Sequence, residues 1–137
     1  MALIKWTPSL SVGLTILDAD HIILVGIVNQ LYDAMTEGHG EELVKPILST
    51  MRQYTDYHFR REESLMKEHN YPKYEEHKKQ HEVLVQTLDG FMGRYAKDTK
   101  SVTANEISRF MQAWLVNHIQ NIDFGYKPYM HDSGNTC

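Results

Sequence analysis

The segment from His58 to His81 carries two pairs of potential metal ligands, and each pair has helical spacing. His58 and Glu62 are four residues apart, and so are His77 and His81. Four residues are about one turn of an α-helix, so each pair projects from one helix face. A turn signal that ends in Pro72 separates the pairs, because proline ends one helix and can begin the next. The segment therefore predicts two antiparallel helices that bring three imidazoles and a carboxylate together.

Helical periodicity covers most of the remaining chain, and no run shows the alternation typical of a strand. We expect an arm over residues 1–17, helices over about 19–37, 41–69, 72–96 and 104–123, and a small polar tail over 125–137. Asp18 is the expected N-cap of the first helix, and Thr103 opens a capping-box pattern before the fourth. Pro46 predicts either a separate short first turn or a kink in the second helix. Four amphipathic helices with short connections predict one all-α domain, an up-down-up-down four-helix bundle.

This connectivity places the start of the first and third helices at the same end as the close of the second and fourth. Every candidate ligand falls at that end on a core-facing seam: His21, His58, Glu62, His77, His81, His118 and Asp123. Asp123 lies five positions after His118, about 140° around an ideal helix, so it requires a loosened last turn. Seven ionisable groups gathered in a bundle interior are costly unless a cation compensates them. The sequence therefore predicts a metal site.

Taken singly, these residues have ordinary interpretations. A lone histidine on a helix seam is usually a satisfied core residue, and a His-x-x-x-Glu pair is often a weak surface contact. Among the eight histidines, His39, His69 and His131 fall in a loop, at a helix end and in the tail, so we expect them to be solvated. The single cysteine, Cys137, excludes an intramolecular disulfide, and we interpret it as an exposed thiol.

The donor set favours iron among the common metals. Five imidazoles and two carboxylates exceed what one tetrahedral zinc can use. The donor set contains no cysteine, which disfavours soft-metal and iron–sulfur sites. Calcium and magnesium prefer all-oxygen shells. Two octahedral irons offer about twelve positions. Five imidazoles, two bridging carboxylates and one bridging oxo or hydroxo leave one position for a small ligand.

Composition excludes several other classes of protein. A net charge of −4 gives no electrostatic reason to expect nucleic acid or an anionic membrane as a partner. The longest apolar stretch, Ile22 to Val28, is too short to insert across a bilayer, and the N-terminus lacks the features of a signal peptide. We therefore expect a cytoplasmic protein.

The ligand pattern His21, His58-x-x-x-Glu62, His77-x-x-x-His81 and His118-x-x-x-x-Asp123 resembles the hemerythrin family at every ligand position. The segments Ser11-Val12-Gly13, Glu63-x-Leu65-Met66 and Tyr71-Pro72 are similar to the bacteriohemerythrin branch, and the resemblance extends from about Trp6 to Asp123. It implies a non-haem di-iron centre, two iron ions with a bridging oxo or hydroxo, that binds O₂ reversibly. It further implies that His77, His81 and His118 bind one iron, that His21 and His58 bind the other, and that Glu62 and Asp123 bridge them.

The resemblance also implies an O₂ pocket formed by Leu24, Phe59, Trp114, Leu115 and Ile119, which would keep water and protons from the bound ligand. The simpler interpretation of these five residues is core packing, and both can hold. One departure lies around His21, where relatives commonly carry Gln or Glu before the histidine and polar residues after it. Asp20, Ile22 and Ile23 occupy those positions here, so access to the iron could differ.

The leading functional hypothesis is an O₂-binding monomer for storage, delivery or sensing, with an O₂-consuming enzyme as a recipient. The alternative is a di-iron enzyme that acts on peroxide, O₂ or nitric oxide. Carboxylate-rich enzymes of that kind use Glu-x-x-His motifs, which this chain lacks, so we expect no enzymatic activity. A third hypothesis is an interaction module in which iron is structural or reports redox state.

Overall fold

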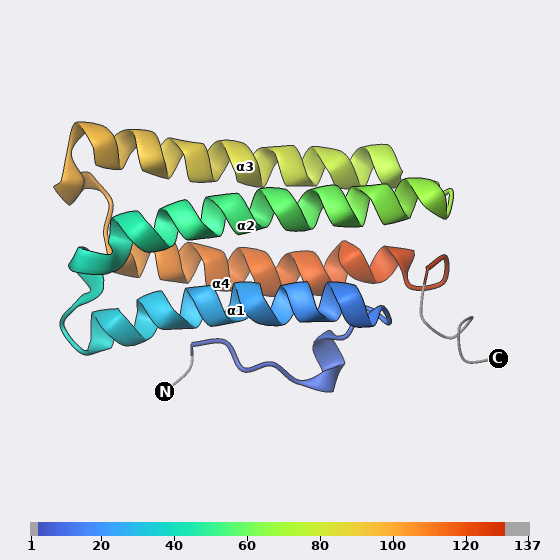
Figure 1. Cartoon of the computed structure of the whole chain (residues 1–137), viewed down its shortest axis with the longest axis horizontal. Helices are drawn as coiled ribbons and strands as arrows, with labels where there is room; N and C mark the ends of the chain where they lie inside the picture. The colour runs from blue at the N-terminus through green and yellow to red at the C-terminus, as the bar shows by residue number, and fades with distance from the viewer. Residues whose placement is uncertain (1–2, 131–137) are drawn as a thin grey trace.

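The computed structural model describes residues 3–130 and shows four long helices packed side by side (Figure 1). Helix α1 spans Thr15–Thr36, α2 spans Gly40–Glu68, α3 spans Tyr74–Lys97 and α4 spans Ala104–Asn121. Short 3₁₀ segments precede α1 (η1, Pro8–Leu10), join α3 to α4 (η2, Thr99–Ser101) and follow α4 (η3, Asp123–Tyr126). The described residues contain no β-strand. The predicted all-α, up-down-up-down four-helix bundle is therefore confirmed.

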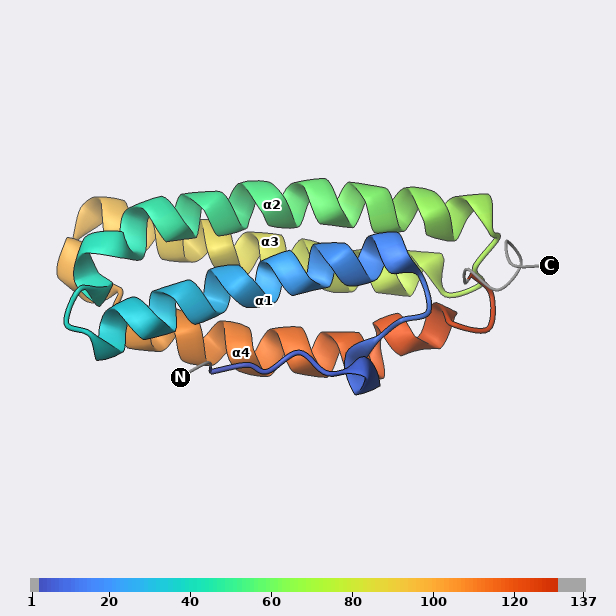
Figure 2. The ribbon, with the colours of Figure 1, turned by 60° about the horizontal axis from the view of Figure 1, so that its bottom comes forward.

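The chain direction alternates from helix to helix, so one end of the bundle collects specific helix termini (Figures 1 and 2). The starts of α1 and α3 lie beside the ends of α2 and α4, as the connectivity predicted. We call this end the site end. The N-terminal arm runs along the bundle toward the site end (Figure 2), and the Asn29 side chain anchors it through hydrogen bonds with the backbone N and O of Ile4, at 2.8 and 2.7 Å.

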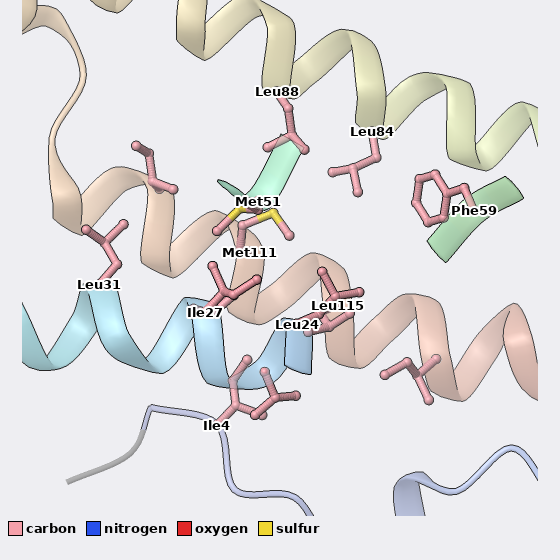
Figure 3. Close-up of a cluster of buried hydrophobic side chains, with 14 of the residues drawn as sticks. Ile4, Leu24, Ile27, Leu31, Met51, Phe59, Leu84, Leu88, Met111 and Leu115 are labelled. Atoms are coloured by element: carbon pink, nitrogen blue, oxygen red, sulfur yellow. The ribbon is translucent and has the colours of Figure 1, made fainter. Parts of the chain in front are cut away.

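The apolar core fills the space between the helices behind the site end. Figure 3 shows side chains from all four helices that meet in this interior: Leu24, Ile27, Leu31, Met51, Phe59, Leu84, Leu88, Met111 and Leu115. They recur at the three- and four-residue spacings that the sequence pattern predicted. Burial of such a side chain contributes about 1.5–3 kcal/mol, so this core fixes the helices that position the site.

Helix α1 begins four residues earlier than expected, and the N-cap assignment of Asp18 is wrong. Leu14 is the N-cap residue, and burial of Leu14 and Leu17 explains why the helix starts here. Asp18 lies in the first turn. Its carboxylate accepts hydrogen bonds from Ser11 Oγ at 2.6 Å and from the Val12 backbone N–H at 2.8 Å. Asp18 therefore ties the arm to the helix.

The structure of α2 and the ends of α4 can be compared with the helices that the sequence predicted. Helix α2 is continuous through Pro46, so a separate first turn is wrong. Thr103 is the N-cap of α4, and its Oγ1 accepts a hydrogen bond from the Glu106 backbone N–H at 3.0 Å, as predicted. Helix α4 ends at Asn121, and Asp123 begins η3 instead of continuing the α-helix. This change of geometry is the loosened last turn that Asp123 required.

The described part of the expected tail, residues 125–130, differs from the polar segment that the sequence suggested. Tyr126 and Met130 are buried, so the part up to residue 130 packs on the bundle. His131 and Cys137 lie outside the described residues. A helix both long and apolar enough to cross a membrane does not occur between residues 3 and 130.

Candidate metal centre

Seven side chains meet inside the site end of the bundle, and each residue is at most 3% exposed. They are the predicted set: His21 on α1, His58 and Glu62 on α2, His77 and His81 on α3, His118 on α4 and Asp123 at the start of η3. Their nitrogen and oxygen atoms form two groups, each with atoms within 4.8 Å of one another. One contains Glu62, His77, His81, His118 and Asp123, and the other contains His21, His58 and Glu62. We call the imidazoles of these groups the three-histidine half (His77, His81, His118) and the two-histidine half (His21, His58).

The carboxylate of Glu62 faces both halves. Its Oε1 lies 3.1 Å from His77 Nε2 and 2.9 Å from His81 Nε2. Its Oε2 lies 3.5 Å from His58 Nε2 and 3.8 Å from His21 Nε2. One oxygen therefore belongs to each half.

Asp123 has the same arrangement. Its Oδ1 lies 2.9 Å from His77 Nε2 and 3.0 Å from His118 Nε2, whereas its Oδ2 lies 3.1 Å from His21 Nε2. Two carboxylates that each offer one oxygen to either half are placed as bridges between two cations.

Several ligand nitrogens and oxygens lie close to one another without forming a hydrogen bond. Their separations can be compared with those of atoms that bind one cation. His81 Nε2, His118 Nε2 and both Asp123 carboxylate oxygens are buried and make no hydrogen bond within the described residues. Nitrogen and oxygen ligands at right angles, about 2.1 Å from one ion, lie about 3 Å apart. The observed separations of 2.9–3.1 Å match this value. The donor set therefore fits metal ions.

Electrostatics in the cluster keep the carboxyl groups ionised. Burial by itself raises the pKa of Glu62, but the charge of His58 and close contacts with the imidazoles of His58, His77 and His81 lower it well below the usual range. Burial and the charge of Glu62 raise the pKa of Asp123, yet the charge of His118 and the close contacts with His118 and His21 together outweigh them, so this pKa also falls below its usual range. Both side chains are available as anionic ligands.

Two imidazoles of the cluster, those of His58 and His77, hold protons strongly. Burial lowers the pKa of His58, but the charge of Glu62 and hydrogen bonds with Asp20 and Glu62 raise it to about 10. Burial likewise lowers the pKa of His77, and close contacts with the carboxylates of Asp123 and Glu62 raise it to about 9. Protons in these positions balance the buried carboxylates in the way that cations would.

Three further side chains hydrogen-bond to the cluster, and the sequence did not assign them to the site. His58 Nδ1 lies 2.9 Å from Asp20 Oδ2, and His81 Nδ1 lies 2.7 Å from Glu63 Oε2. The Tyr126 hydroxyl donates to Glu62 Oε2 at 2.7 Å. Asp20 and Glu63 adjoin ligands in the sequence, which was the available signal. Tyr126 gave none, because it fell in the expected tail.

Aromatic rings orient the three-histidine half. Each imidazole there has a nearly parallel aromatic neighbour: Phe59 on His81 with ring centroids 3.6 Å apart, Trp114 on His118 at 4.3 Å, and Tyr126 on His77 at 5.7 Å. Of these partners, Phe59 and Trp114 were expected near the site as pocket residues. Stacked rings restrict rotation of the imidazoles and keep their Nε2 atoms aimed inward.

A small apolar cavity of about 10 Å³ adjoins the cluster. It contacts both imidazoles of the two-histidine half but only His118 of the other half. Of the predicted pocket residues, Leu24, Phe59, Trp114 and Leu115 line it, together with Thr55, Leu84 and Met111, which the sequence did not suggest. Ile119 is fully buried but does not line the cavity. A volume of this size accommodates about one water-sized molecule.

Ile22 and Ile23 are 47% and 46% exposed, so they face solvent and not the cluster. Neither side chain lies in the cluster, and an effect of these residues on access to the metal stays a prediction. His39 and His69 are exposed, as expected.

Taken together, the bundle and the bridging arrangement define a four-helix protein with a nitrogen-rich site for two cations. Residues 12–130 match the family model described as the hemerythrin HHE cation binding domain. The chain belongs to the hemerythrin family, and its sequence relatives include members of the bacteriohemerythrin branch.

Relatives from animals and bacteria align over most of the chain. Hemerythrin of Phascolopsis gouldii is 35% identical over 123 residues, which cover 89% of each chain. Bacteriohemerythrin of Methylococcus capsulatus is 30% identical over 129 residues, which cover 93% of this chain and 97% of the relative. Among solved structures, wild-type hemerythrin superposes with a TM-score of 0.84 at 28% identity, and the match covers 93% of this chain and 98% of that one.

Proposed function

We propose that this protein binds O₂ reversibly at a non-haem di-iron centre. The observation that carries the proposal is the pair of carboxylates, Glu62 and Asp123, each with one oxygen toward either histidine half. The similarity to proteins named hemerythrin and bacteriohemerythrin supports iron as the metal and O₂ as the ligand. The apolar cavity beside the two-histidine half supports a small uncharged ligand.

The seven residues would divide between two ions. His77, His81 and His118 would hold one iron, His21 and His58 the other, and Glu62 and Asp123 would bridge them together with an oxo or hydroxo group. Two ferrous ions supply two electrons that O₂ can accept and return. Because one half has only two imidazoles, we place the open position there, next to the cavity.

The protein's own contribution to reversibility is to exclude water. Leu24, Leu115 and Phe59 give the cavity an apolar wall, and none of the three is more than 5% exposed. This apolar part of the wall offers no proton to a bound ligand, which favours release as O₂ over loss as a protonated, reduced species.

The proposal also covers the domain organisation, localisation and partners of the protein. We infer one hemerythrin-like domain over residues 1–137 that acts as a cytoplasmic monomer without enzymatic activity. It would store, deliver or sense O₂, and an O₂-consuming enzyme would be its recipient. The net charge of −4 supports the absence of a nucleic-acid partner.

Anaerobic loading tests the proposal directly. The metal-free protein would be reconstituted with ferrous iron, assayed for iron, and then cycled between air and argon while its visible spectrum is recorded. We expect two irons per chain and absorption bands that appear in air and disappear under argon. Bands that do not reverse, or far fewer than two irons, would contradict it, and rapid turnover of peroxide would favour the enzymatic alternative.

A further inference from the structure

The two carboxylates that bond the outer nitrogens of the cluster differ in their surroundings. Asp20 is buried against α2, and its side chain is 4% exposed. Glu63 lies at the edge of the site with a side chain that is 20% exposed. Each bonds one imidazole, but those imidazoles, His58 and His81, belong to different halves.

Side chains of α2 enclose Asp20. The Tyr54 hydroxyl donates to Asp20 Oδ1 at 3.0 Å, His58 Nδ1 lies 2.9 Å from Oδ2, and Arg61 Nε lies 3.3 Å from Oδ2. Tyr54, His58 and Arg61 are three or four residues apart, so they form one stripe of the helix. The Arg61 guanidinium also lies 4.7 Å from the centre of the Tyr57 ring and donates to the Tyr57 hydroxyl. We call Asp20, Tyr54 and Arg61 the Asp20 clasp.

The clasp determines which nitrogen of His58 faces the cluster. A carboxylate beside Nδ1 keeps the proton on that nitrogen, which leaves Nε2 for a cation. The opposite charge of Arg61 compensates Asp20, so this carboxylate can remain buried and ionised. The clasp therefore determines three properties of the His58 imidazole: its tautomer, its orientation and its basicity.

We propose that the Asp20 clasp positions His58 and thereby controls metal affinity in the two-histidine half alone, whereas Glu63 has the corresponding role for His81 in the three-histidine half. This inference rests on the two-ion site proposed above. Among the seven ligands, the side chain of Asp20 bonds only His58, and that of Glu63 bonds only His81. The two positions can therefore be adjusted separately, although Glu62 and Asp123 join them.

A stepwise metal titration tests this separation. Metal-free protein would be titrated anaerobically with Co²⁺ against a competing chelator, and the Co²⁺ absorption bands would follow each step. The three-histidine half offers more imidazoles, so we assign the tighter step to it and the weaker step to the two-histidine half. Asp20→Asn should weaken the weaker step by roughly 10–100-fold and leave the tighter step unchanged.

Glu63→Gln is the matched variant, because it neutralises the other outer carboxylate. We expect it to weaken the tighter step and spare the weaker one. Asp20→Glu restores a carboxylate and should recover most of the affinity that Asp20→Asn loses, which a purely structural role of Asp20 would not predict. Tyr54→Phe keeps Asp20 but removes one bond to it, so it should weaken the same step by a smaller factor. If Asp20→Asn does not fold, this variant provides the test.

The outcomes separate this inference from the proposed function. A wild-type protein that binds fewer than two Co²⁺ ions would contradict the two-ion site itself. If the wild type binds two ions, three results would overturn the inference alone: no effect of Asp20→Asn, equal weakening of both steps, or the same step weakened by Asp20→Asn and Glu63→Gln. Melting curves followed by circular dichroism would verify that each variant is folded.

Discussion

At the scale of single residues, the site depends on two fully buried carboxylates that connect groups of imidazoles from different helices. Glu62 and Asp123 are each 0% exposed, and an ionised carboxylate in such a place requires compensating charge. In the metal-free protein protonated imidazoles provide it, and in the proposed metal-bound protein cations would. Glu62 and Asp123 therefore differ from the five imidazoles, because each carboxylate contacts both histidine halves.

Glu62→Ala should abolish binding of a second metal ion and weaken binding of the first. The substitution removes one oxygen from each half and one negative charge from the interior. Iron per chain after anaerobic loading measures the effect. Glu68→Ala is the control, because Glu68 is an exposed carboxylate on the same helix. Two irons with an unaltered spectrum in Glu62→Ala would show that Glu62 does not bridge.

Leu115→Ala should accelerate autoxidation of the oxygenated protein, because loss of the side chain enlarges the cavity beside the two-histidine half and admits water. The rate at which the oxygenated spectrum decays in air measures this. Leu88→Ala is the matched control, since Leu88 is equally buried but does not line the cavity. Each substitution should cost about 2–5 kcal/mol of stability. Equal autoxidation rates in the two variants would exclude Leu115 from the barrier to water.

The seven ligands could be predicted from the sequence, but not all of the side chains that hydrogen-bond to them. The seven ligand positions followed from helical spacing and connectivity, because a side chain on the core-facing side of a helix must point into the bundle interior. The hydrogen bonds of Asp20 and Glu63 depend on how closely two helices approach and on side-chain rotamers, which spacing does not define. Tyr126 reaches Glu62 from η3, and a polar-looking tail did not predict a buried side chain there.

At the scale of elements, two helix ends determine where ligands stand. The arm and the first turn of α1 are joined through Asp18, two residues before the clasp residue Asp20 and three before the ligand His21. The end of α4 changes from α-helix to η3, which carries Asp123 into the cluster. Boundaries of this kind were the least accurate part of the sequence prediction. Asp18 resembled an N-cap by residue type, but burial of Leu14 and Leu17 moved the helix start upstream.

Asp18→Ala should lower the free energy of unfolding by about 1–2 kcal/mol, because two hydrogen bonds to an ionised side chain are lost and the Val12 N–H loses its acceptor. Urea unfolding of the metal-free protein would measure the change. Glu37→Ala, an exposed substitution at the other end of α1, should shift it by less than about 0.5 kcal/mol. Equal stabilities for both variants would show that Asp18 does not anchor the arm.

At the scale of the whole molecule, connectivity is the reason that the site could be predicted at all. Three alternations of chain direction bring residues more than one hundred positions apart, His21 and Asp123, to 3.1 Å. The same arrangement concentrates charge, since five imidazoles and two carboxylates share one bundle end. The stability of the metal-free molecule should therefore depend on pH in a specific direction.

Folding raises the pKa of His58 from 6.5 to about 10 and that of His77 from 6.5 to about 9. Below pH 6.5 both groups are protonated in the folded and unfolded states, so their contribution to stability is fully present. It is lost as the pH rises through the folded-state values. The metal-free protein should therefore become less stable between about pH 7 and 10, as measured by melting temperature.

The metal-loaded protein provides the control for this pH dependence. Its imidazoles bind cations instead of protons, so its melting temperature should change less over the same interval. A metal-free protein whose melting temperature is constant or rises up to pH 10 would show that the imidazoles are not protonated in the folded state.

The position of Asp123 just beyond α4 has a consequence for how the protein is made. A ribosome synthesises the chain from its N-terminus, so six of the seven ligands emerge before the last bridging carboxylate does. Before residue 123 is added, the chain lacks one of the two carboxylates that lie between the histidine halves. Binding of two ions between both carboxylates therefore requires synthesis to have passed residue 123, and a chain interrupted before that residue would carry the histidines without the second bridge.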